Sequence, residues 1–110
     1  MNRTMVTGRL GVDAELRKGK EGNNDYLSFS LAVQDRIGNV GDKVTNWYSC
    51  TYNAKEGSRV IDYLKKGTKI FAEGRVYAYN KDDEARLALY IHKIELLNSG
   101  RGVESDEVPF

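Results

Sequence analysis

The sequence is poor in the residues that most often build disulfides, metal sites and catalytic sites. Its 110 residues contain one cysteine (Cys50), one histidine (His92) and one proline (Pro109). A single cysteine cannot form an internal disulfide, and such usage is typical of cytoplasmic proteins. One histidine and one cysteine also leave no cluster with the ligand spacing of a zinc site. We therefore expect a cytoplasmic protein that binds no metal or other cofactor.

Long apolar runs are missing as well. No stretch approaches the roughly 18 consecutive apolar residues that a membrane-spanning helix requires, so we expect no membrane partner. The first ten residues do not have the apolar segment and cleavage site of a signal peptide. A chain of 110 residues is long enough for one domain and too short for two. We expect one domain over residues 1–98, followed by a short linker and tail over residues 99–110.

The sequence also offers no set of residues suited to catalysis. Cys50 and His92 would form a nucleophile and its base only if the fold brought them together, and a packed thiol with a surface imidazole explains them better. Asp82, Asp83 and Glu84 are adjacent acids of the kind found in a solvated turn. The glycines near residue 10 are not followed by a helical pattern, so they do not form a phosphate-binding loop. We therefore expect a protein that is not an enzyme.

Alternation of apolar and polar residues predicts strands over most of the chain. In "YLSFSLAVQ", residues 26–34, every second residue is apolar, which is typical of a half-buried strand. "VTNWYSCTYN", residues 44–53, is rich in β-branched and aromatic residues and predicts another strand. Between them "DRIGNVGDK" predicts a polar connection. "RTMVTGRL", residues 3–10, followed after Gly11 by "AELRK", predicts a first strand that bends at a glycine.

The pattern changes once and then returns to alternation. In "EGSRVIDYLKKG" the spacing of Val60, Ile61 and Leu64 fits one face of a short helix that ends at a glycine. "TKIFAEGRVYAYN", residues 68–80, and "RLALYIHKIELL", residues 86–97, predict two further strands, joined by a charged turn, "NKDDEA". An all-β domain with one short helix between its third and fourth strands is typical of a five-stranded Greek-key barrel, the OB-fold.

Aromatic residues occur where a small core does not need them. In the strand at 68–80, Tyr77 and Tyr79 share a row with Lys69 and Arg75, and Trp47 lies among polar residues of an earlier strand. Rings beside cations on a pleated face suit unpaired nucleic acid, because bases stack on the rings while Lys and Arg contact phosphates. Duplex DNA hides its base faces, so such a surface favours single strands. The alternative is that these rings fill the core or a subunit contact.

Charge is unevenly distributed along the chain. The sequence has 17 Lys and Arg against 16 Asp and Glu, and three of the acids lie after residue 102, so residues 1–102 carry a net charge of +4. A basic domain with an acidic end fits a polyanion binder that also carries a competing anion. The final "VESDEVPF" combines acids with Pro109 and the apolar ring of Phe110. A ring next to a carboxylate gives two separate anchors for a protein partner.

Three segments resemble bacterial and phage-type single-stranded DNA-binding proteins. "TGRLGVDAELR" resembles the "VGNLGxDPExR" opening of that family. "NWYSCTYNAKEGSRVIDYLKKGTKIFAEGRV" is similar to its central block, in which a Trp-bearing strand precedes a helix and the next strand. "DEVPF" resembles the acidic "DDIPF" tip. The resemblance implies an OB-fold that usually forms homotetramers, with Tyr48 near a subunit contact.

The resemblance also implies roles for individual residues. The DNA-contact residues that we expect are the rings of Trp47, Tyr52, Tyr77 and Tyr79 and the cations Arg36, Lys43, Lys69 and Arg75. A further stacking ring of the family would fall near Ile37, where this chain has no aromatic residue. The partner-binding tip that we expect comprises Asp106, Glu107, Val108, Pro109 and Phe110.

These observations predict a protein that binds and protects single-stranded DNA without sequence specificity. Through its tip it would recruit replication, repair and recombination proteins. Two alternatives remain open at the level of sequence. One is a protein-interaction OB domain similar to that of a primosome protein, and the other is an OB domain directed to RNA, because ring stacking does not detect a 2′-hydroxyl.

Overall fold

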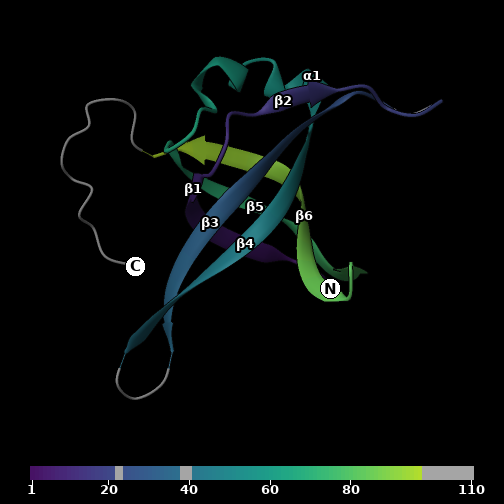
Figure 1. The fold of residues 1–110 in the computed structure, drawn as a ribbon. Helices are drawn as coiled ribbons and strands as arrows, with labels where there is room; N and C mark the ends of the chain where they lie inside the picture. The colour runs from purple at the N-terminus through teal and green to yellow at the C-terminus, as the bar shows by residue number, and fades with distance from the viewer. Residues whose placement is uncertain (22–23, 38–40, 98–110) are drawn as a thin grey trace.

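The structure is a computed structural model that describes residues 1–21, 24–37 and 41–97. Within these residues it consists of strands with two short helical segments (Figure 1). The elements are β1 (Thr4–Leu10), β2 (Glu15–Arg17), β3 (Tyr26–Ile37), β4 (Asp42–Asn53), α1 (Ala54–Gly57), the 3-10 helix η1 (Ile61–Tyr63), β5 (Lys69–Lys81) and β6 (Glu84–Leu96).

Five of the strands close into a barrel. The sheet has the order β1-β5-β6-β4-β3-β2, and β1 also pairs with β3 at Arg9↔Ala32 and Leu10↔Leu31, which closes the sheet on itself. β4 and β6 run parallel, and the other paired strands run antiparallel. The predicted five-stranded Greek-key barrel is therefore confirmed. The residues of "AELRK", predicted as the continuation of the bent first strand, instead contain the separate short strand β2, which pairs with β3.

The interior of the barrel is filled from the apolar rows that alternation predicts. Leu27, Phe29 and Leu31 of β3 are all buried. The rest of the core cluster comes from other elements: Leu10, Cys50, Tyr52, Leu64, Ile70, Ala72, Leu89 and Ile91. Burying one large apolar side chain contributes about 1.5–3 kcal/mol. These contacts fix which residues of each strand face outward, and so determine the composition of the outer surface.

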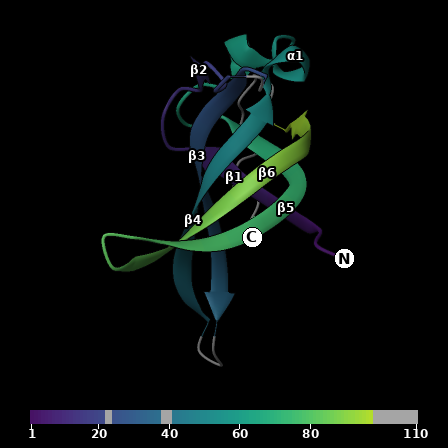
Figure 2. The same cartoon turned by 90° about the vertical axis from the view of Figure 1, so that its right-hand side faces the viewer.

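Two hairpins extend from the barrel on the side away from α1 (Figures 1 and 2). The β3–β4 hairpin is paired from Tyr26↔Asn53 to Ile37↔Asp42, so both strands continue into the segment for which the sequence predicts a polar connection. The β5–β6 hairpin turns at Asp82 and Asp83, whose φ angles are 55° and 65°. Positive φ at both central residues is typical of a two-residue hairpin turn, and the predicted charged turn is confirmed.

The helical segment differs from the prediction. The apolar spacing predicts one short helix within residues 56–67, but the structure has α1 at Ala54–Gly57 and then the separate 3-10 helix η1. The helix begins earlier because Oδ1 of Asn53 accepts hydrogen bonds from the backbone N–H groups of Lys55, at 2.8 Å, and Glu56, at 3.3 Å. The predicted apolar face is correct, since Leu64 is fully buried and Val60 and Ile61 pack against the core.

Candidate nucleic-acid interface

One outer surface of the barrel runs across β5, β6, β4 and β3. Tyr77 of β5 lies opposite Ala88 of β6, Ala88 lies opposite Ser49 of β4, and Ser49 lies opposite Ser30 of β3. Directly paired residues in neighbouring strands point to the same side of a sheet. Since the residues adjacent to them in β4 and β6, Cys50 and Leu89, are buried in the core, this row faces outward.

Four large rings stand exposed on this surface, and we call them the aromatic face. Trp47 is 54% exposed, Tyr77 44%, Tyr79 39% and Tyr90 51%. Between and beside them the outward positions hold small side chains, including Ala32, Ser30, Ser49 and Ala88. Rings separated by small residues leave room for a flexible chain to approach the sheet closely. Exposed apolar side chains that gather on one face, rather than being scattered singly, are typical of an interaction surface.

Contacts between side chains limit the motion of the tyrosines. The rings of Tyr77 and Tyr90 pack with their centroids 5.4 Å apart and their planes tilted by 57°. The hydroxyl of Tyr79 donates a hydrogen bond to Oγ of Ser49 at 3.4 Å. Rings that are already positioned lose less conformational entropy when a ligand binds. The aromatic face is therefore suited to stacking against flat groups.

Gly11 provides the surface on which the indole of Trp47 rests. A Cβ atom at position 11 would lie 2.6 Å from Cζ3 and 3.0 Å from Cη2 of Trp47, and 2.9 Å from Oγ of Ser30. The distances of 2.6 Å and 2.9 Å are shorter than real Cβ contacts, so any larger residue at this position would displace the indole or the Ser30 side chain. The missing side chain lets the edge of the indole lie against the backbone while 54% of the residue stays exposed.

Cations lie directly beside the tyrosines. Arg75 of β5 lies opposite Tyr90, and Arg86 of β6 lies opposite Tyr79. Arg86 is held by Glu84 through an Nη2–Oε1 contact of 3.1 Å. Among the residues that the structure describes, Arg75 forms no ion pair. Its guanidinium is therefore available to an anionic ligand.

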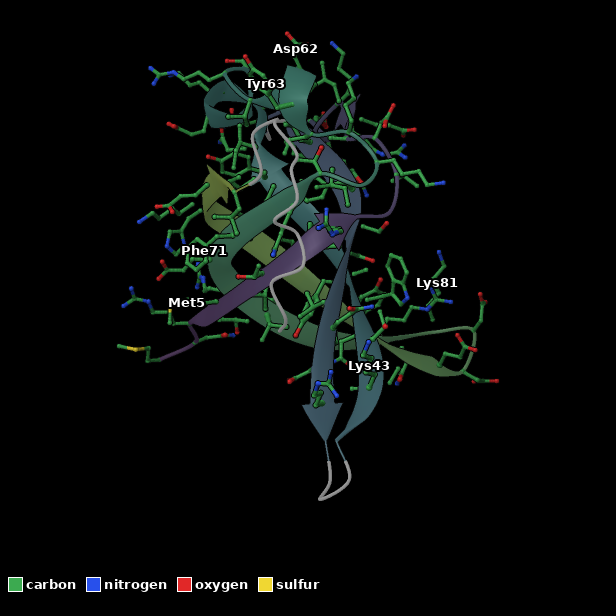
Figure 3. The ribbon with its side chains drawn as sticks, turned by 90° about the vertical axis from the view of Figure 1, so that its left-hand side faces the viewer. Met5, Lys43, Asp62, Tyr63, Phe71 and Lys81 are labelled. Atoms are coloured by element: carbon green, nitrogen blue, oxygen red, sulfur yellow. The ribbon has the colours of Figure 1, made fainter. Side chains whose placement is uncertain are left out.

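Further cations come from the two hairpins. Lys43 of β4 lies opposite Arg36 of β3, and both are exposed. Nη1 of Arg36 donates a hydrogen bond to the carbonyl of Gly41 at 3.1 Å. Lys81 lies at the end of β5, and Figure 3 shows Lys43 and Lys81 on the two different hairpins. Each hairpin thus contributes cations near the aromatic face, and on the β5–β6 hairpin Lys81 is followed by the acids Asp82, Asp83 and Glu84.

The structure places two of the expected DNA-contact residues elsewhere. Tyr52 is 8% exposed and belongs to the core cluster, because the inward row of β4 contains its even-numbered positions. Burial, followed by the negative charge of Glu56, raises the pKa of the Tyr52 hydroxyl. Lys69 is also only 8% exposed and pairs with Arg9 of β1 in register. Neither residue belongs to the aromatic face.

The expected partner-binding tip, Asp106 to Phe110, lies outside the described residues.

Two members of the outer surface were not predicted from the sequence. Tyr90 and Arg86 share an outward row with Ala88 in β6. The signal was present, because positions 86, 88 and 90 alternate with Leu87, Leu89 and Ile91. That alternation alone places the arginine and the tyrosine on one side of the strand.

The cysteine and the histidine are kept apart by the fold. Cys50 is buried in the core, and burial raises the pKa of its thiol to about 12, so the reactive thiolate is scarce at neutral pH. The side chain of His92 is 62% exposed and lies 3.9 Å from the carboxylate of Glu73.

In the described part of the chain, no group of three or more His, Cys, Asp or Glu residues could hold a metal ion. None of the described helices is long and apolar enough to cross a membrane.

The fold and this surface together define a class of protein. A five-stranded Greek-key barrel is an OB-fold domain, and rings, small residues and cations on one outer face are typical of OB-folds that bind nucleic acid.

Comparison with known proteins gives the family. The model of the single-strand binding protein family matches residues 1–98, and the chain belongs to this family. It is 30% identical over 95 residues to single-stranded DNA-binding protein 1 of Staphylococcus aureus strain MSSA476, which covers 86% of this chain and 60% of that protein. It is 32% identical over 87 residues to single-stranded DNA-binding protein 1 of Chlorobaculum tepidum, covering 76% of this chain and 52% of that protein. The chain therefore spans little more than half the length of these relatives.

Solved structures share the fold. A Plasmodium falciparum SSB in complex with single-stranded DNA superposes with a TM-score of 0.67 at 20% identity, covering 88% of this chain and 95% of that chain. A small single-stranded DNA-binding protein from Streptomyces coelicolor superposes with a TM-score of 0.68 at 17% identity, covering 86% and 92%.

Proposed function

We propose that this protein binds single-stranded DNA without sequence specificity, on the aromatic face. The observation that carries the proposal is the exposure of four rings on one barrel surface beside outward-pointing cations. Stacking on an aromatic side chain contributes about 1–3 kcal/mol per base, for which single-stranded DNA-binding proteins are a standard example. Every base has a flat face, so a surface of this kind tolerates any sequence.

The same chemistry favours single strands over duplex. In a duplex the base faces are stacked on one another, so they cannot reach Trp47 or the tyrosines. Cations alone would then provide binding, which is weaker and depends mainly on salt. The names of the relatives from Staphylococcus aureus and Chlorobaculum tepidum support this choice of ligand.

The protein acts by binding, and we include no catalytic step in the proposal. The protection of exposed strands requires only that bases and phosphates be covered. The buried thiol of Cys50 and the separate, exposed imidazole of His92 do not favour a reaction at this surface.

We further propose that the protein forms a homo-oligomer, expected to be a tetramer. Tyr48, the residue expected near a subunit contact, is half-buried and packs against the core. Met5 of β1 is 59% exposed on a different part of the molecule from Lys43 and Lys81 (Figure 3). A subunit contact at Met5 would cover this apolar side chain and leave the aromatic face open to DNA.

A titration with oligo-dT tests the DNA-binding proposal. Because Trp47 is the only tryptophan, its emission reports on the aromatic face alone. We expect oligo-dT to quench this emission, and the logarithm of the association constant to fall by about 0.7 per phosphate contact for each log unit of salt. Duplex of the same length should quench little. Equal affinity for duplex, or no quenching, would contradict the proposal, and equal binding of oligo-rU would extend it to RNA.

The acidic tail is proposed to recruit replication, repair and recombination proteins. The support is chemical: Asp106 and Glu107 offer anions, and Val108 and Phe110 offer apolar groups to a partner pocket. We expect Phe110→Ala to abolish capture of partner proteins from a bacterial extract while oligo-dT affinity stays the same or improves. If the variant still captures the same partners as the unchanged chain, this part of the proposal is wrong.

A further inference from the structure

A small pocket lies at one end of the aromatic face. Its volume is about 340 Å³, at the small end of the range for ligand pockets. It is lined chiefly by two lysines, an asparagine, two tyrosines and a threonine. These are Lys18, Lys20, Asn24, Tyr26, Thr51 and Tyr90.

The pocket is continuous with the aromatic face. Tyr90 and Thr51 are paired neighbours on β6 and β4, so they belong to the same outward surface as Tyr77. The ring of Tyr90 contacts Tyr77 on one side, with centroids 5.4 Å apart, and it also lines the pocket. A strand stacked on Tyr77 would therefore reach the pocket at its next step along the surface.

The other wall comes from the connection between β2 and β3. Within it, the backbone N–H of Gly19 donates a hydrogen bond of 3.1 Å to Oδ1 of Asp25. This bond holds the residues on either side of Gly19, Lys18 and Lys20, next to the pocket that they line. Both lysines are exposed, and within the described residues neither forms an ion pair.

We propose that this pocket binds one terminal nucleotide of the strand that crosses the aromatic face, which rests on the proposed function above. The base lies against Tyr90 with Tyr26 lining the same pocket, and Asn24 offers hydrogen bonds to the base edge. The phosphate is neutralised by Lys18 and Lys20. A volume of about 340 Å³ suits a single nucleotide rather than several.

The proposal is tested by removing the two charges. Lys18→Gln/Lys20→Gln is compared with Lys65→Gln/Lys66→Gln, which makes the same charge change at exposed residues that do not line the pocket. Binding of oligo-dT of increasing length is measured at several salt concentrations. A strand too short to span the surface is expected to occupy Trp47, Tyr77 and Tyr79, where most of the rings lie, so it should bind both variants as it binds the unchanged chain.

Longer strands should reveal the pocket. In the Lys18/Lys20 variant only, the slope of log K against log salt concentration should become shallower by about 0.7 for each phosphate that has lost its lysine. This change corresponds to about fivefold weaker binding at 0.1 M salt. A dT strand with 4-thiothymidine at one end should also crosslink to Tyr90 or Tyr26 from that end, and not when the label is central.

The possible failures are distinguishable. If the unchanged chain binds oligo-dT but the two double variants match at every length, the pocket does not contact DNA and this inference alone is wrong. If the Lys18/Lys20 variant loses the same affinity for short strands as for long ones, the two lysines act only through long-range attraction of DNA. That result would overturn a site for a terminal nucleotide. If the unchanged chain binds no oligo-dT at all, the proposed function itself fails.

Discussion

Trp47→Ala is expected to weaken oligo-dT binding by about fivefold to 150-fold, the range that corresponds to the roughly 1–3 kcal/mol of one stacked base. The indole is 54% exposed and rests on Gly11 on the outer surface of the barrel. Its loss should therefore remove stacking without opening the core. Because the variant has no tryptophan emission to follow, anisotropy of a fluorescein-labelled oligo-dT is the appropriate measurement.

Tyr63→Ala is the matched control for this experiment. Tyr63 is 60% exposed in η1, and it does not belong to the aromatic face (Figure 3). Both variants remove one exposed ring, so their thermal unfolding should differ little from that of the unchanged chain. If Trp47→Ala keeps full affinity, or if Tyr63→Ala loses as much, stacking on the aromatic face cannot explain binding.

Leu89→Ala is expected to lower the free energy of unfolding by about 2–5 kcal/mol, as large-to-small changes in well-packed cores do. Leu89 is fully buried in β6, between Val76 of β5 and Cys50 of β4 in register. Domains of this size have a total stability of about 5–15 kcal/mol, so the loss is a large fraction of the whole. Urea unfolding followed by the emission of Trp47 measures it.

The control for the core change is Leu97→Ala. Leu97 is 46% exposed, so the same truncation should cost less than about 0.5 kcal/mol. Where both variants are still folded, both should bind oligo-dT like the unchanged chain, because neither side chain lies on the aromatic face. Equal stability of the two variants would show that the interior near β6 is not packed as described.

The barrel follows from the sequence because alternation is strong where one side of a strand is buried. The row of Leu27, Phe29 and Leu31 identifies the inward side of β3 without ambiguity. The helical segment was harder to predict, because its start depends on one hydrogen-bonding side chain, Asn53, rather than on apolar spacing. β2 was predicted only as the continuation of β1 beyond a glycine, because its three residues are all exposed and no apolar row marks them as a separate strand.

The candidate site could be predicted only in part. Trp47, Tyr77 and Tyr79 are exposed as the sequence pattern suggests. In β4, however, aromatic residues occupy both rows, and tyrosine is compatible with core and surface alike, so the sequence does not reveal that Tyr52 faces inward. The pocket beside Tyr90 joins residues from the β2–β3 connection, β3, β4 and β6, and only the fold brings them together.

Nuclear magnetic resonance of the chain with and without oligo-dT tests the central claim most directly, because the indole Nε1–H of Trp47 gives one resolved signal. We expect that signal to move on binding, together with the backbone signals of Tyr77, Tyr79 and Tyr90 on β5 and β6. Duplex of the same length should leave the indole signal in place. Shifts confined to α1, η1 or β1, with no change at Trp47, would contradict the account.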